Sequence, residues 1–202
     1  MNYDFEIVLS FIKNLIKYEK MSFTPSKIIY FYPASLPKPP VEWHIDFPDI
    51  PIEYDSELPT DEDWWASVPK DTLIVIDDYW EVAASSSAIA NTFKVFARHG
   101  RYSVIIVSQS YFERGPYSIV IRNNLNAIAL FESSSNLDVN TRVAKTLGYS
   151  KEFKLAKKVY NKYPYSYVLF NVHPRCPRAF RICTNLFSEN PPHYPMFHSI
   201  KR

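Results

Sequence analysis

The feature of this sequence that most constrains its fold is an apolar run that ends in two carboxylates. Residues 72–80 read TLIVIDDYW, in which the apolar residues 73–76 precede Asp77 and Asp78. A short continuous run of this kind is typical of a strand that is buried on both faces, as in a parallel sheet. Ligands of such sheets bind at the carboxyl ends of the strands. We therefore expect Asp77 and Asp78 to lie at the ligand-binding edge of a parallel sheet.

Other segments alternate between helical and strand patterns. Apolar residues at helical spacing predict a helix over 4–19, and KIIYFY predicts a buried strand over 27–32. Further helices are expected at 60–65 (with Thr60 as its cap), 86–98, 137–147 and 151–162, and further strands at 103–110, 126–132, 167–172 and 180–187. Many of the 16 prolines fall in residues 33–60, where we expect irregular chain. This order predicts one α/β domain over residues 1–202, with a mainly parallel sheet and helices on both faces.

Composition excludes several classes of protein. The 202 residues are 47% hydrophobic and 22% charged, which are globular values, and the net charge of +2 does not by itself indicate a nucleic-acid binder. Two cysteines and no amino-terminal apolar core argue against secretion. No apolar run is long enough to cross a membrane. We expect an intracellular protein of the cytoplasm, nucleus or virion, with no membrane partner.

Three polar residues at strand ends are candidates for nucleotide chemistry. Asp77 would hold Mg²⁺ directly or through water, and Asp78 would orient or deprotonate an attacking water. Gln109, at the tip of the strand over 103–110, would sense a γ-phosphate or position that water. The alternative is that the acids only mark a turn, since apolar strands often end in aspartate.

The phosphate-binding part of such a site is missing from the sequence. The three glycines are Gly100, Gly115 and Gly148, and none begins a Gly-Lys-Ser or Gly-Lys-Thr. A phosphate loop needs that motif for its backbone N–H cradle and its lysine. No residue is therefore assigned to binding the nucleotide phosphates.

Three stretches together resemble one protein family. TLIVIDD, VFARHGRYSVIIVSQSYF and IVIRNNLNAIALFESSSN occur in the order found in poxvirus-type genome-packaging ATPases of the FtsK–HerA superfamily, which have relatives in Maverick/Polinton elements. The resemblance covers roughly residues 10–150 and leaves 151–202 as a helix with terminal strands. It implies a P-loop NTPase-like (ASCE) fold in a ring-shaped, ATP- and Mg²⁺-dependent motor that threads double-stranded DNA into capsids.

The resemblance also implies roles for individual residues. Asp77 and Asp78 match the Walker B acids, and Gln109 matches the polar sensor. An arginine that acts across a subunit boundary is expected in this superfamily, and Arg122 is preferred because it follows the sensor strand. The other candidates are Arg98, Arg101 and Arg114. Each of the four has the alternative of being an ordinary surface arginine.

The first strand and phosphate loop of the family would precede the helix over 4–19, so the domain is expected to be truncated. We expect the 202 residues alone neither to hydrolyse ATP nor to bind it tightly. The chain is then a fragment or degenerate copy of a packaging ATPase, or a non-catalytic interaction protein that keeps the fold. A third hypothesis, an unrelated α/β domain, would be favoured if Asp77, Asp78 and Gln109 did not lie close together.

Weaker patterns remain. Residues His173, Cys176 and Cys183 match no zinc spacing well and are better explained as a strand cysteine pair. Five lysines in 151–164 can contact the phosphate backbone of DNA, or form a solvated helix face. Trp64 and Trp65 predict a helix with one inward indole, or a patch that binds a partner.

Overall fold

A computed structural model groups the chain into two compact units. The parallel-sheet unit is Phe11–Asn124, and the antiparallel-sheet unit is Met1–Ser10 with Leu125–Arg202. The structure describes residues 3–17, 21, 23–35, 43–96, 102–109, 111–131, 137–160, 167–184 and 186–187. A single domain over 1–202 stays a prediction.

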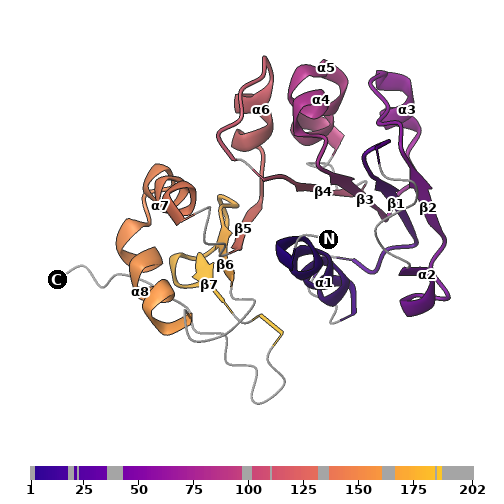
Figure 1. Ribbon diagram of the computed structural model, residues 1–202. Helices are drawn as coiled ribbons and strands as arrows, with labels where there is room; N and C mark the ends of the chain where they lie inside the picture. The colour runs from indigo at the N-terminus through magenta and orange to yellow at the C-terminus, as the bar shows by residue number, and fades with distance from the viewer. Residues whose placement is uncertain are drawn as a thin grey trace. The chain divides into compact units, whose positions relative to one another are not determined.

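The parallel-sheet unit is built on four parallel strands in the order β2-β1-β3-β4 (Figure 1). The strands are β1 (Lys27–Phe31), β2 (Ile52–Asp55), β3 (Thr72–Asp77) and β4 (Tyr102–Val107). Every residue of β3 is buried, because β1 and β4 flank it in the sheet and helices cover its faces. The α/β fold with a parallel sheet is thereby confirmed, as is the buried strand that ends in Asp77.

Helices cover both faces of this sheet, as predicted (Figure 1). On one side lie the Phe11–Lys17 part of α1 (Tyr3–Lys17) and α2 (Trp43–Asp46), and on the other α3 (Glu62–Ser67), α4 (Trp80–Ser85), α5 (Ser87–Asn91) and α6 (Ser118–Asn123). Successive residues of β1 face opposite layers. The ring of Tyr30 lies edge-on to Trp43 of α2 at 5.3 Å, and that of Phe31 to Trp64 of α3 at 5.6 Å.

The proline-rich segment contains a strand that the sequence pattern did not reveal. Residues 36–42 lie outside the described residues, but β2 pairs in parallel with β1, and Ile28 N donates to Pro51 O at 2.9 Å. Ile52 and Tyr54 are half-buried, whereas Glu53 and Asp55 are exposed. Proline is tolerated at the start of an edge strand, so the expectation of irregular chain throughout 33–60 is wrong.

Two helix predictions need correction. Asp61 rather than Thr60 caps α3, because its carboxylate accepts from Trp64 N at 2.7 Å. The helix expected over 86–98 begins with α5, which Ser86 caps, and continues as a π-helix over Thr92–Phe96. Residues 97 and 98 lie outside the described residues. Trp65 is completely buried, which confirms the inward indole.

From Leu125 onward, the described residues of the antiparallel-sheet unit include a three-stranded sheet in the order β5-β6-β7 and two α-helices. Its elements are β5 (Ala127–Phe131), α7 (Leu137–Thr146), α8 (Ser150–Tyr160), β6 (Tyr167–Asn171) and β7 (Ile182–Cys183). The strand predicted over 126–132 is present as β5, but it pairs antiparallel with β6 in a second sheet and is not part of the parallel sheet. Within the strand predicted over 180–187, only the two residues of β7 form a strand among the described residues.

No helix in the described part of the chain is both long and apolar enough to span a membrane.

Candidate functional site

The carboxyl ends of β3 and β4 meet at one edge of the parallel sheet. Asp77 is in register with Val107, and Asp78 N donates to Val107 O at 3.1 Å, which ties the two strand ends together. Asp78 has a φ of 56°, in the left-handed region that aspartate tolerates better than most residues. The chain thus leaves β3 abruptly, with Asp77 buried and Asp78 exposed.

Gln109 lies beside the second acid. Its Nε2 donates to Asp78 Oδ2 at 3.4 Å, and both side chains are exposed. The structure therefore brings the predicted glutamine and the predicted acid pair to the same strand edge. If the chain were an unrelated α/β domain with an incidental acid pair, nothing would require this contact.

Asp77 points into the protein rather than into solvent. It is 1% exposed, and its Oδ2 accepts a hydrogen bond from Tyr30 OH at 2.9 Å. Its Oδ1 is buried without a hydrogen-bond partner among the described residues. Burial raises the pKa of Asp77 to about 6, and the charge of Asp78 adds to this, while the hydrogen bond from Tyr30 opposes it. A proton or a cation would satisfy the orphaned oxygen.

Sequence reasoning missed Tyr30, which lay unremarked inside the apolar strand KIIYFY. Burial and the neighbouring Asp77 raise the pKa of Tyr30 above its usual value, so it remains a neutral donor. The signal was available, because a tyrosine on a buried strand needs a partner for its hydroxyl. What the sequence could not supply was the partner, which lies 47 residues away.

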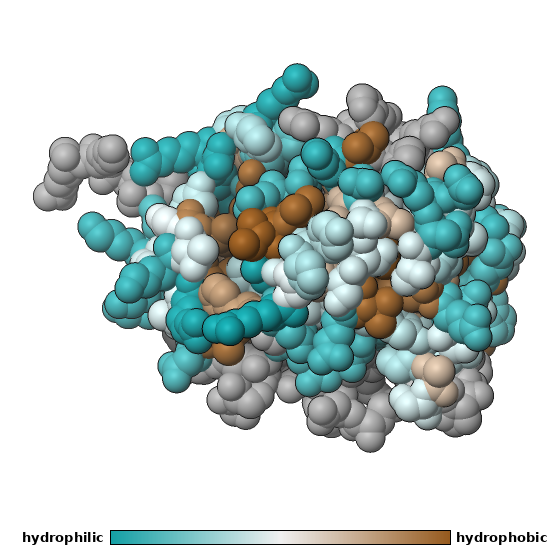
Figure 2. Space-filling model, turned by 90° about the horizontal axis from the view of Figure 1, so that it is seen from above, coloured by the Kyte–Doolittle hydropathy of each residue, from teal (hydrophilic) through white to brown (hydrophobic). Residues whose placement is uncertain are grey.

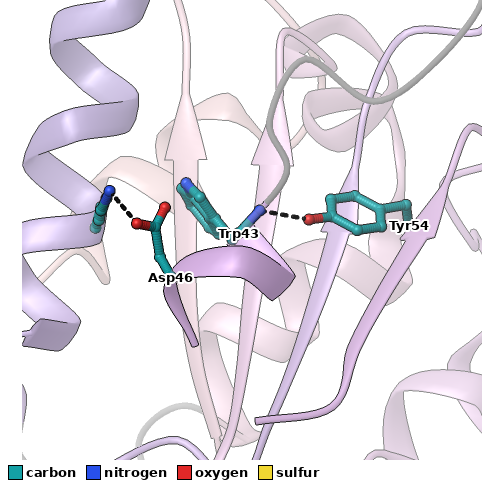
Figure 3. Close-up of polar contacts among 4 residues, drawn as sticks. Trp43, Asp46 and Tyr54 are labelled. Atoms are coloured by element: carbon teal, nitrogen blue, oxygen red, sulfur yellow. Dashed lines mark hydrogen bonds and ion pairs between the residues drawn. The ribbon is translucent and has the colours of Figure 1, made fainter. Parts of the chain in front are cut away.

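The short helix α2 packs against Tyr30, because the ring of Trp43 lies edge-on to that of Tyr30. Trp43 N donates to Tyr54 OH at 3.0 Å (Figure 3). Asp46, at the end of α2, forms an ion pair with Lys13 of α1 at 2.5 Å. Tyr30 of β1, the hydrogen-bond partner of Asp77, thus contacts α2 and β2, and one ion pair joins α2 to α1.

Arg122 is engaged within the chain. Its guanidinium donates to Tyr111 O at 3.0 Å, to Glu113 O at 3.2 Å and to Ser118 Oγ at 3.2 Å, and lies 5.7 Å from the Tyr111 ring centroid. These contacts fasten the loop that follows Gln109, and none reaches the two acids. That Arg122 acts across a subunit boundary stays a prediction.

The loop over 111–117 is also anchored to α4, the helix that follows the acid pair. Trp80 Nε1 donates to Glu113 O at 3.3 Å, and Tyr117 N donates to Ala84 O at 2.9 Å. A Cβ added to Gly115 would lie 2.6 Å from Ala84 Cβ, so the close approach needs glycine. Among the other candidate arginines, Arg114 is exposed, and Arg98 and Arg101 lie outside the described residues.

The two acids are ligands of the type that Mg²⁺ binds. Mg²⁺ is commonly bound through one or two carboxylates, with water and substrate phosphates completing its shell. Asp78 offers an exposed carboxylate and Asp77 an orphaned oxygen. Within the described ranges, no group of three or more His, Cys, Asp or Glu residues is placed to hold a metal. The nucleotide does not fit in the same way, because no phosphate loop is present in the 202 residues.

The cysteines show no sign of a metal centre in the part of the chain described. Both are free; Cys183 is buried in β7 and Cys176 is half-buried in the preceding loop. Burial, with a contribution from Cys176, raises the pKa of Cys183 to about 11, so it stays a thiol at neutral pH. A thiol is a poor metal ligand, because the thiolate is the coordinating form.

Comparisons with known proteins found no match: no family model, no curated protein and no solved structure matches this chain. The packaging-ATPase resemblance thus depends on the motifs alone.

Proposed function

We propose that the chain carries the acidic half of a magnesium–nucleotide site of the packaging-ATPase type, on a P-loop NTPase-like sheet. The observation that carries the proposal is the contact between Gln109 and Asp78 at the ends of neighbouring parallel strands, beside the buried Asp77. The 202 residues alone do not turn over ATP in this proposal; they are a fragment or a degenerate copy of such an ATPase.

Each residue has a distinct task in the proposed site. Asp78 is the outward ligand for Mg²⁺ or for a water, and the Gln109 amide orients that carboxylate. Asp77 contributes its orphaned Oδ1 from inside, and Tyr30 fixes its other oxygen. When bound, Mg²⁺ supplies positive charge between these carboxylates and an anionic ligand.

The absence of a phosphate-binding loop is the reason why no ATP hydrolysis is expected. Phosphate groups in this kind of site are held by a cradle of backbone N–H groups and a lysine. Without the cradle, the exposed carboxylate at the strand edge repels a polyphosphate rather than holding it. The cradle would have to come from outside these 202 residues.

The 202-residue chain is expected to show no magnesium-dependent ATP hydrolysis above an Asp78→Asn control. The measurement is phosphate release from MgATP, with both proteins prepared in parallel. Because Asp78 is exposed, its asparagine variant keeps the fold and isolates the carboxylate. A wild-type rate clearly above that of the variant would overturn the proposal that this chain alone is inactive.

The burial of Asp77 favours a second candidate, a non-catalytic interaction protein with the packaging-ATPase fold. In that case the Tyr30–Asp77 pair is a structural contact between β1 and β3. The two candidates differ in one measurable property, since only the first requires the acid pair to bind a divalent cation.

A further inference from the structure

Tyr79, which directly follows the acid pair, reaches from the end of β3 to the ends of β1 and β2. Its hydroxyl donates to Ser56 O, just after β2, at 2.5 Å and to Tyr32 O, just after β1, at 3.0 Å. Neighbouring strands lie about 4.8 Å apart, so the side chain must extend along the edge of the sheet to make both contacts. Tyr79 thus joins three strand ends at the edge that carries the acids.

Both carbonyls are held in place by other hydrogen bonds. Tyr32 N donates to Asp55 O at 3.0 Å, which ties the end of β1 to that of β2. Glu57 N donates to the Asp55 side chain at 2.9 Å, which fixes the turn that contains Ser56. The Tyr79 hydroxyl has one proton for its two acceptors, and the shorter contact places that proton toward Ser56 O.

Tyr79 occupies a position that its residue type rarely takes. It is the N-cap of α4, but its side chain makes no hydrogen bond to that helix. Serine, threonine, aspartate and asparagine are the preferred caps, and Asp78 lies one residue too early to be the cap. The Asp78 carboxylate is therefore left beside Gln109 instead of on the helix. Departures from local preference concentrate at functional sites.

The conformation of Asp78 also needs support from its neighbours. Its φ of 56° is strained for a residue with a side chain, and such a conformation persists where the surrounding structure holds it. On one side, Asp78 N donates to Val107 O of β4 at 3.1 Å. On the other side, Tyr79 O accepts from Ala83 N at 2.9 Å, and the Tyr79 hydroxyl is fixed as described. Contacts on both sides thus hold the turn.

Docking of a partner on the helices would be another reason to fix the start of α4. Val82 of α4 and Ile119 of α6 are exposed apolar side chains. In Figure 2, which views α3 to α6 from above, apolar side chains form separate groups with hydrophilic side chains between them. Soluble proteins commonly expose apolar side chains in this way, so they do not identify a partner. The acid that precedes Tyr79 is therefore the better explanation of its contacts.

We propose that Tyr79 is a positioning residue of the acid pair, whose hydroxyl holds the turn that sends the Asp78 carboxylate outward beside Gln109. Without the hydroxyl, the turn relaxes toward the right-handed or extended conformations that aspartate prefers, and the carboxylate leaves its place. The inference rests on the proposed function for the task of Asp78. The contact itself can be measured without a cation.

The test compares Tyr79→Phe with the wild type and with Tyr102→Phe by amide hydrogen exchange, read by NMR. Phenylalanine keeps the ring and removes only the hydroxyl. In the control, the lost hydroxyl also donates to a backbone carbonyl, Trp65 O, at 3.2 Å. Tyr102 is in register with Thr72, at the opposite end of β3 and about 20 Å along the strand from Asp78.

In Tyr79→Phe, the Asp78 amide is expected to exchange about tenfold faster than in the wild type, since one hydrogen bond that secures the turn is lost. The amide of Ile74, in the middle of β3, should change no more than it does in Tyr102→Phe. A purely structural role would raise exchange along all of β3 alike, because a loss of global stability acts on every protected amide.

Binding of Mn²⁺ alone, measured by electron paramagnetic resonance, is the second readout. Tyr79→Phe should bind Mn²⁺ about tenfold more weakly than the wild type, the usual size of effect for a residue that orients a metal ligand. Tyr102→Phe should stay within about twofold, because it lies far from the acids.

Exchange at Asp78 that rises equally in the two variants, or that does not rise in Tyr79→Phe, would overturn the proposal. So would equal Mn²⁺ affinity of Tyr79→Phe and a wild type that binds Mn²⁺. Absence of Mn²⁺ binding by the wild type would instead contradict the proposed cation site, and the exchange rates would still decide whether Tyr79 holds the turn.

Discussion

Asp77→Asn is expected to make the protein more stable at pH 8, by up to about 3 kcal/mol, and to change its stability little near pH 3.5. Asp77 is almost wholly buried, and burial raises its pKa from 3.8 to about 6. Asparagine is nearly the same size and can still accept the hydrogen bond from Tyr30 OH. Asparagine carries no charge, so its burial does not cost the hydration free energy of a carboxylate.

The direction of this pH dependence follows from the number of protons that the folded and unfolded states bind. Between pH 3.8 and about 6 the folded state holds a proton on Asp77 that the unfolded state has lost. The free energy of unfolding contributed by this group therefore falls as pH rises through that window, and stays low above it. Since one pKa unit corresponds to about 1.4 kcal/mol, the separation of the two pKa values gives about 3 kcal/mol.

Urea unfolding followed by tryptophan fluorescence at pH 3.5, 5, 6, 7 and 8 measures this difference. All four tryptophans lie in the parallel-sheet unit, so the signal reports on the unit that contains Asp77. Asp71→Asn is the control, because Asp71 is an exposed aspartate at the other end of β3 and should follow the wild type within about 0.5 kcal/mol. A loss of stability in Asp77→Asn that is equal at every pH would contradict the account of this carboxylate.

Trp65→Ala is expected to cost about 3–5 kcal/mol of unfolding free energy, the range for deleting a large buried aromatic side chain. Trp65 is completely buried in α3, and its indole Nε1 donates to Pro59 O at 2.9 Å. Truncation leaves a cavity between α3 and the sheet, and removes the donor from a part-buried carbonyl.

Trp64→Ala is the matched control for this substitution. Trp64 is the adjacent residue on the same helix, but it is half-buried and packs edge-on against Phe31. Its loss should cost clearly less, about 1–2 kcal/mol. Equal losses in the two variants, measured by urea unfolding with circular dichroism, would show that the two indoles are not divided between core and surface as described.

The candidate site could be predicted from the sequence because its residues sit at strand ends. The apolar run before Asp77 predicted a buried strand. If the next strand along the chain is its parallel neighbour, the two strands end at the same edge, which places Gln109 near the acids. The left-handed turn at Asp78, which sends the second acid outward while the first stays inside, is not visible in an apolar pattern. Neither is the hydrogen bond to Tyr30, which joins residues far apart in the sequence.

The pairing of strands was predicted less well than their existence. A short apolar run such as Ala127–Phe131 indicates a strand, but carries no information about its partner or direction. β2 was missed for a different reason: it has four residues, only two of them face the core, and a proline precedes it. Long buried strands can be predicted from the sequence pattern. Short edge strands depend on neighbouring strands, which the sequence pattern does not identify.

Binding of Mn²⁺, a paramagnetic stand-in for Mg²⁺, tests the central claim about Asp77 and Asp78 most directly. Free Mn²⁺ is measured by electron paramagnetic resonance in titrations of the wild type, Asp78→Asn, and the exposed control Asp63→Asn. The account predicts a weak site, with a dissociation constant on the order of 1 mM, that Asp63→Asn keeps and Asp78→Asn abolishes. No binding by the wild type, or equal binding by wild type and Asp78→Asn, would contradict it and favour a non-catalytic protein.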